Sequence, residues 1–162
     1  MRFVILSVVS CLTLAFNAST SSAAEPKAVA LNAVATLFVE HDVAAFKGFV
    51  DDGAIQGDRE RGSAIAKFDK QRPETMKAIG LSQVIFFRAA NIERLAKLYP
   101  DELWERVEKH IGDQQGVLVK LALTGEKARR VREAGKDPND IAMMTFVLNS
   151  QQEPKIVHID NN

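Results

Sequence analysis

The sequence predicts an α+β fold, in which N-terminal helices pack on a curved, mainly antiparallel sheet formed largely by the C-terminal part of the chain. Two observations support this prediction. In the first part of the chain, apolar residues recur at spacings of three and four, the period of an amphipathic helix. Beyond Gly112 the period changes to two, and β-branched residues alternate with others between turn residues, which is typical of strands.

Residues 1–24 have the order of a secretory signal peptide. Arg2 gives a positive start, Phe3 to Phe16 is mainly apolar, and small residues lead to Ala24. We expect cleavage after Ala24 and export of the mature chain to the periplasm or the exterior. Residues 25–162 then suit a single α+β domain with a core of its own.

The composition of the chain limits the classes of partner that we expect it to bind. The chain has 21 Lys and Arg residues against 21 Asp and Glu, so no global attraction to nucleic acid or to anionic membrane is implied. No segment after the signal is long and apolar enough to span a bilayer. Cys11 would leave with the signal, which excludes disulfides and thiolate chemistry from the mature chain. The three histidines have no metal-ligand spacing, so neither a metal nor a cofactor is expected.

The helical part begins with Ala28 to Val39, whose apolar residues form one stripe. Asp42 is expected to cap a short second helix, Val43 to Val50, because its carboxylate can accept from the free amides of the next turn. Asp51-Asp52-Gly53 is expected to end that helix, and Ala54 to Gln56 to form a short strand.

Short elements are expected in the middle of the chain. A charged loop leads to a helix capped by Ser63, and Pro73 begins a turn or short helix through Ile79. Leu81 to Phe87 is apolar and short, so it fits either a strand or a buried helical segment. Asn91 is expected to cap the next helix.

The following helix is the most regular one of the sequence. Pro100 is expected to open it and Gly112 to close it. Charged residues on one side form pairs at four-residue spacing, including Glu102 with Arg106. The other side is apolar and includes Trp104.

Three segments after Gly112 are expected to be strands: Gly116 to Leu123, Ala142 to Asn149 and Lys155 to Asp160. Alternation places one set of apolar side chains on a common face: Val117, Val119, Leu121, Leu123, Met144, Phe146, Leu148, Val157 and Ile159. The opposite face holds Lys120, Thr145, His158 and Asp160, and it is expected to be mostly exposed to solvent.

The order of helix, aspartate-capped helix, Asp-Asp pair, strand, charged loop and helix resembles the opening of the nuclear transport factor 2-like superfamily. The matching residues are Ala35 to Ile55 and Arg61 to Lys70, and Met143 to Asp160 looks like the final hairpin of that family. The resemblance implies a cone-shaped α+β fold, like that of ketosteroid isomerases and polyketide cyclases. It also implies a homodimer through the sheet. Arg88 to Gln115 departs from the family plan by being helical.

The resemblance does not convey the chemistry of the isomerases. The position of their general-base aspartate falls on Gly57, and that of their oxyanion tyrosine falls on Val34. Asp58 lies one place late, and such a slip on a strand points the side chain to the opposite face. General acid/base work needs both geometry and a tuned pKa, so isomerase chemistry of that type is not expected.

Other polar residues have a structural explanation beside a functional one. His41-Asp42 could be a dyad, but Asp42 is already expected to cap a helix. Asp51 and Asp52 could be paired carboxylates, or exposed turn residues. Lys127 to Lys136 is the most basic stretch, yet acids interleave with it and no aromatic residue is present for base stacking.

Two histidines complete the set of candidate polar residues. His110 lies in the last turn of its helix, where a cation complements the dipole. His158 and Asp160 share one face of a strand, where they could form a site or a wet surface.

The leading hypothesis is an exported small-ligand-binding or accessory domain with no evident catalytic machinery. Its apolar pocket would involve Phe38, Trp104, Met144 and Phe146, unless these side chains simply fill the core. One alternative is an isomerase or dehydratase that uses Asp52 or Asp58 as its base. Another is an envelope protein, such as an inhibitor or a secretion accessory, that binds a protein partner through Lys127 to Lys136.

Overall fold

A computed structural model describes residues 24–57, 73–139 and 141–161. Its sheet has four antiparallel strands in the order β1-β2-β3-β4. These are β1 (Ile79–Phe87), β2 (Gln115–Leu123), β3 (Ala142–Leu148) and β4 (Ile156–Asn161). The predicted α+β class is confirmed, and the three strands expected after Gly112 are present. The ambiguous segment Leu81 to Phe87 belongs to a strand, β1.

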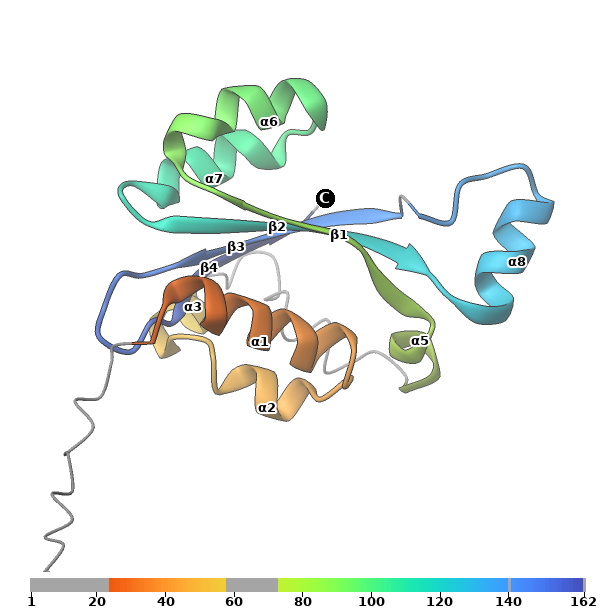
Figure 1. Cartoon of the computed structure of the whole chain (residues 1–162), viewed down its shortest axis with the longest axis horizontal. Coiled ribbons are helices and arrows are strands. Elements are labelled where there is room, and N and C mark those ends of the chain that lie inside the picture. Colours follow the sequence, from red (N-terminus) through yellow and green to blue (C-terminus); the bar gives the residue numbers. More distant parts are fainter. Residues whose placement is uncertain (1–23, 58–72, 140, 162) are drawn as a thin grey trace, which may run out of the picture.

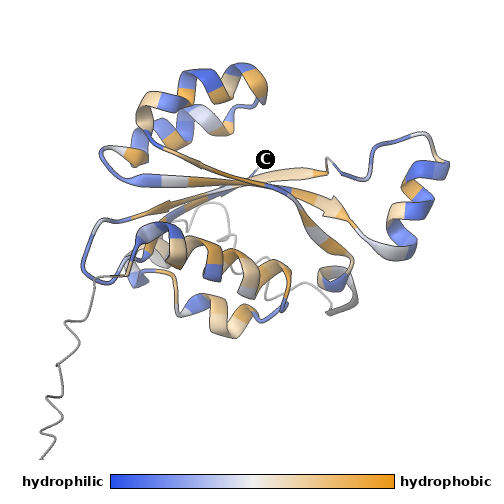
Figure 2. Ribbon diagram, in the orientation of Figure 1, coloured by the Kyte–Doolittle hydropathy of each residue, from blue (hydrophilic) through white to orange (hydrophobic). Residues whose placement is uncertain are grey.

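Helices cover both faces of this sheet, as Figure 1 shows. On one face lie α1 (Pro26–Phe38) and α2 (Val43–Lys47), and on the other lie α6 (Ile92–Leu98) and α7 (Leu103–Ile111). The shorter elements are α3 (Asp52–Gly57), α5 (Pro73–Lys77) and the 3-10 turn η2 (Ala89–Asn91). Helix α8 (Gly125–Glu133) lies beyond the end of the sheet and is mainly hydrophilic (Figures 1 and 2). No helix of these described ranges is long and apolar enough to cross a membrane.

The start of α2 follows from its capping residue. The carboxylate of Asp42 accepts a hydrogen bond from the amide of Ala45 at 2.8 Å, so the predicted cap is confirmed. His41, just before it, has a positive φ of 59°, which reverses the chain between α1 and α2. The helix ends at Lys47, earlier than the sequence predicted.

The prediction of a short strand at Ala54 to Gln56 is wrong, because these residues belong to α3. The carboxylate of Asp51 accepts from the amide of Gly53 at 2.8 Å, and the carbonyl of Asp51 accepts from the amide of Ala54 at 3.0 Å. Asp51 therefore begins a helical turn instead of opening a strand. The helix expected after Ser63 lies outside the described residues.

Two further helix starts differ from the prediction. The side chain of Asn91 accepts from the amide of Arg88 at 3.2 Å, within η2, and does not cap α6. Helix α7 begins at Leu103, not at Pro100, because the carboxylate of Asp101 accepts from the amide of Leu103 at 2.8 Å. Gly112 ends α7 with a φ of 45°, as predicted.

The first core lies between α1, α2 and one face of the sheet. The helices contribute Ala30, Ala33, Val34, Leu37, Phe38 and Phe46. The strands contribute Val117, Val119, Leu121, Met144, Phe146, Leu148 and Ile156. Most of the face predicted from period two is therefore confirmed as core.

The second core lies between α6, α7 and the opposite face of the sheet, which was predicted from the sequence to be mostly exposed to solvent. That expectation is wrong. Its buried members are Phe87, Ile92, Leu95, Leu103, Trp104, Val107, Ile111, Leu118, Met143 and Val147. Because α6 and α7 are inserted between β1 and β2, they fold back onto the sheet and exclude water from this face.

A register shift between β3 and β4 shows that the predicted orientation of Val157 is wrong. Val147 pairs with His158, but Leu148 pairs with Ile156, so β4 has a bulge at Val157. Ile156 and Ile159 therefore face the first core, and Val157 packs against the second. The extra residue reverses the alternation that had placed Val157 beside Ile159.

Truncation of Leu118, which is 0% exposed in the second core, tests whether both faces are packed. We expect Leu118→Ala to lower the free energy of unfolding by about 2–5 kcal/mol, because it removes buried methyl groups and leaves a cavity. Leu98→Ala is the control, since Leu98 is 63% exposed, and it should change stability by less than about 0.5 kcal/mol. Urea unfolding measures both, and equal effects would contradict a buried second face.

Candidate functional site

The four side chains predicted to line a pocket lie in two separate cores. Phe38, Met144 and Phe146 are buried in the first core, and Trp104 is buried in the second. The sheet stands between them, so Trp104 does not share a site with the other three.

Close packing surrounds these aromatic side chains. The ring of Phe146 meets Phe46 edge-on with centroids 5.9 Å apart, and Trp104 meets Phe87 in the same way at 5.6 Å. The indole N–H of Trp104 donates to the carbonyl of Tyr99 at 2.7 Å, so its polar atom is satisfied within the protein. The four residues thus act as core residues, which was the structural alternative for them.

The carboxylates considered as catalytic bases are not gathered around a pocket in the described residues. Asp52 is exposed in the first turn of α3, where the positive end of the helix dipole stabilises a negative charge. Asp58 lies outside the described residues. Asp42 is occupied as a cap, and the Nδ1 atom of His41 is buried with no hydrogen-bond partner in the described part of the chain.

A polar cluster joins α7 to β4. The guanidinium of Arg106 donates to the carboxylate of Asp160 at 2.6 Å and to the carbonyl of Asn161 at 3.3 Å. Nε2 of His158 lies 3.7 Å from the same carboxylate, and the rings of His110 and His158 stack with centroids 4.1 Å apart. The hydrogen bond to Asp160 raises the pKa of Arg106 above its usual value, so the guanidinium stays charged and paired.

The alternation of the strand predicted that His158 and Asp160 share one face, but no pattern in the sequence pointed to Arg106 as their partner. Arg106 was expected to pair with Glu102 on its own helix, and it binds Asp160 on a strand 54 residues away instead. An acid within an apolar strand was the signal that a partner must exist, because a buried charge needs one. The Arg106–Asp160 pair can hold β4 to α7. In this pair the carboxylate of Asp160 is bound by the guanidinium of Arg106.

No group of three or more His, Cys, Asp or Glu side chains able to hold a metal ion occurs among residues 24–57, 73–139 and 141–161.

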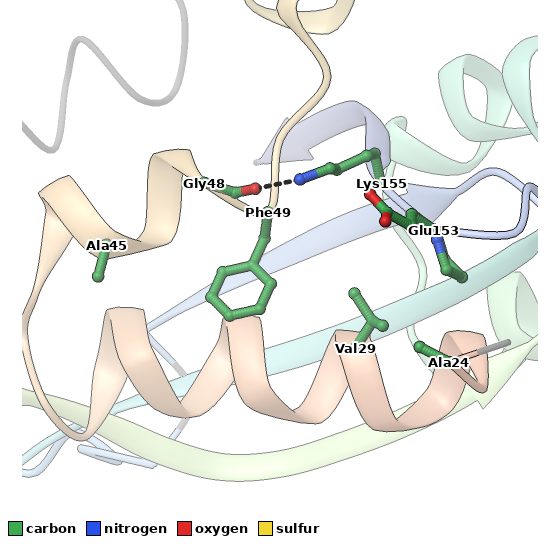
Figure 3. A pocket seen from close by; sticks show the side chains of 8 residues that line it. Ala24, Val29, Ala45, Gly48, Phe49, Glu153 and Lys155 are labelled. Carbon is green, nitrogen blue, oxygen red and sulfur yellow. Dashed lines mark hydrogen bonds between the residues drawn. The ribbon is translucent and has the colours of Figure 1, made fainter. Parts of the chain in front are cut away.

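A groove opens at the other side of the molecule, where α1, α2 and the β3–β4 loop meet (Figure 3). Its volume is about 360 Å³, and it is lined by Ala24, Val29, Ala45, Gly48, Phe49, Glu153, Pro154 and Lys155. We call it the α1–α2 groove. Its size is at the lower end for small-molecule sites, which span roughly 300–1,000 Å³.

Hydrogen bonds fix the walls of the α1–α2 groove. The ammonium of Lys155 donates to the carbonyl of Gly48 at 2.5 Å, which ties the β3–β4 loop to the end of α2 (Figure 3). Ile156 donates its amide to the carbonyl of Phe49 at 2.8 Å and accepts from the amide of Asp51 at 2.8 Å. The amide of Lys155 also donates to the side chain of Asn149 at 3.0 Å. These hydrogen bonds hold the walls of the groove in place, so the groove is preformed.

The chemistry of the groove is mainly apolar. Val29, Ala45, Phe49 and Pro154 supply carbon surface, while Glu153 and Lys155 are the charged residues in the lining. The sequence pointed to neither Phe49 nor Lys155 as a residue of a binding site. The groove joins residues from three distant segments, so no local pattern could have predicted it.

Comparisons of the chain with protein-family models, with curated proteins and with solved structures found no match. The fold defines the chain as an α+β domain, and the α1–α2 groove is its candidate site. Membership of the nuclear transport factor 2-like superfamily stays a prediction from the sequence.

The Arg106–Asp160 pair gives a testable stability difference. Its side chains are 24% and 7% exposed, so we expect Arg106→Ala or Asp160→Ala to lower the free energy of unfolding by about 2 kcal/mol, because either leaves a desolvated charge without its partner. The double variant should cost little more than either single one.

The exposed pair Glu93–Lys97 on α6 is the matched control for this cycle. Its side chains are 85% and 74% exposed, so Glu93→Ala should cost less than about 1 kcal/mol. Urea unfolding of all five proteins measures these differences. Strict additivity of Arg106→Ala and Asp160→Ala would contradict the coupling.

Proposed function

We propose that the chain is an exported, non-catalytic binding domain that takes a small apolar ligand in the α1–α2 groove. The observation that supports it is the groove itself, a hollow of about 360 Å³ in the full chain with mainly apolar walls. Cleavage after Ala24 would remove one residue of the lining and leave Val29, Ala45, Phe49 and Pro154 as its apolar part. Burial of apolar ligand surface there would supply the driving force, at roughly 25 cal/mol per Å² removed from water.

The rigid rim favours ligand binding over a chance surface hollow. The ammonium of Lys155 is already held by the carbonyl of Gly48, so little side-chain freedom remains to be lost when a ligand enters. An ammonium has three N–H donors, and the bond to Gly48 uses one of them. A ligand with an apolar body and an anionic group could therefore bind with its charge at this rim.

The catalytic alternative has less support among the described contacts. An isomerase or dehydratase would need its base inside an apolar pocket, and Asp52 is an exposed residue at the start of α3. The alternative of a partner-binding arm at Lys127 to Lys136 also has a simpler explanation. Arg129 is paired with Glu126 and with Glu133 at 2.7 Å, so much of the charge of α8 is neutralised within the helix.

Filling the groove tests this proposal. Ala45 is an exposed residue of α2 that lines the groove, so Ala45→Trp should occupy the space without disturbing either core. We expect it to weaken binding of anilinonaphthalene sulfonate, and of octanoate as its competitor, about tenfold or more, which is at least 1.4 kcal/mol. Fluorescence titration and calorimetry measure the two affinities.

Ala44→Trp is the matched control. Ala44 is the neighbouring exposed residue of α2 and does not line the groove, so the same substitution there should leave both affinities unchanged. Binding that persists in Ala45→Trp, or that both variants lose equally, would contradict the groove as the site.

A further inference from the structure

The α1–α2 groove is bordered by the residue after which cleavage is predicted. Ala24, the last residue of the predicted signal peptide, and Val29 of α1 both line the groove (Figure 3). All helices and strands of the described residues begin after Ala24, so cleavage there leaves each of them complete. Cleavage would also convert the backbone nitrogen of Glu25 from an amide into a free α-amino group, which is mostly protonated at pH 7. The mature chain would therefore carry a new cation beside the groove.

Helix α1 holds Glu25 in place, so this cation would not lie on a loose tail. Glu25 is the N-cap residue of α1. Its carbonyl accepts hydrogen bonds from the amide of Ala28 at 2.9 Å and from the amide of Val29 at 3.2 Å. Val29 itself lines the groove. Since only the Cα atom separates the α-amino nitrogen from that carbonyl group, the ammonium would stay close to the groove.

The start of α1 adds to the attraction for a negative charge. The first turn of this helix contains no acidic residue, and the side chain of Glu25 makes no capping hydrogen bond. The positive end of the helix dipole is therefore left without a capping carboxylate. The side chain of Glu25 is exposed, so water solvates its charge.

The charge of the lining becomes positive on cleavage. In the full chain Glu153 and Lys155 are the charged residues of the lining, so their charges cancel. The ammonium of Lys155 keeps its charge while it donates to the carbonyl of Gly48. One further ammonium, at Glu25, would leave one positive charge in excess. A mainly apolar groove with excess positive charge favours an apolar molecule that carries an anionic group.

We propose that cleavage after Ala24 completes the α1–α2 groove as a site for an apolar anion, whose charged group is bound by the new ammonium of Glu25. Lys155 is the second cation of this site. The preference for an anion rests on the proposed function of the groove and on the predicted cleavage. The uncleaved chain keeps Ala24 in the lining and lacks the new cation, so it does not have this preference.

A change of one charge at residue 25 tests the proposal. Glutaminyl cyclase converts an N-terminal glutamine to pyroglutamate: the α-amino nitrogen attacks the carbonyl carbon of the side-chain amide, and ammonia leaves. The resulting lactam has no positive charge. Mature Glu25→Gln, before and after cyclisation, therefore gives two forms with different charge at residue 25, and both keep the carbonyl that caps α1. Intact mass shows where the exported chain begins and follows the cyclisation.

Two probes with the same ring system separate the effect of charge from that of apolar contact. Anilinonaphthalene sulfonate carries an anionic group, and phenylnaphthylamine is the same molecule without it. We expect cyclisation of mature Glu25→Gln to weaken binding of the sulfonate about threefold or more, because the sulfonate loses an ion pair at the edge of the groove. Binding of the uncharged probe should not change. Fluorescence titration measures both dissociation constants.

Glu153→Gln is a second test, which leaves the N-terminus unchanged. It removes the acid of the lining, so in the mature chain it should strengthen binding of the sulfonate relative to that of the uncharged probe. Glu108→Gln is the matched control, because Glu108 is an exposed residue of α7, on the other face of the sheet, and does not line the groove. It should change neither affinity.

Three results would overturn the proposal. One is an exported chain that does not begin at Glu25. Another is cyclisation that changes the affinities of the two probes equally or changes neither, which would leave the groove as a site without preference for an anion. The third is binding of both probes that Ala45→Trp does not weaken, since this would contradict the proposed function of the groove itself.

Discussion

A four-stranded sheet has two faces, and in this protein apolar side chains line both of them. Each face must be removed from water, so the sheet needs a helix layer on either side. Helices α1 and α2 cover one face, and the α6–α7 pair, inserted between β1 and β2, covers the other. The position of the Arg106–Asp160 ion pair follows from this two-sided burial.

Two-sided burial explains why Asp160 needs a partner and where that partner comes from. A strand residue on the second face lies under α7, where an unpaired carboxylate would be costly. Arg106 reaches it from α7 and also binds the carbonyl of Asn161, so the last strand is fixed to the helix layer. The cluster of Arg106, His110, His158 and Asp160 thus connects the helix α7 to the strand β4.

The two packed cores also bear on where the proposed ligand would bind. Phe38, Met144, Phe146 and Trp104 fill the spaces on the two faces, so the candidate site moves to the surface, where α1, α2 and the β3–β4 loop leave a hollow. The groove lies at the start of α1, so the predicted cleavage after Ala24 would change its charge and leave both cores complete.

The sequence by itself determined the α+β class, the three C-terminal strands, the cap at Asp42 and the end of α7 at Gly112, because each depends on local periodicity or on one residue's backbone preference. It could not determine that the second face is buried, since strand period two shows which side chains share a face but not what covers it. The bulge at Val157 and the Arg106–Asp160 pair were decided by the tertiary structure. The α1–α2 groove was decided there too, because it joins three segments that only the packing of helices on the sheet brings together.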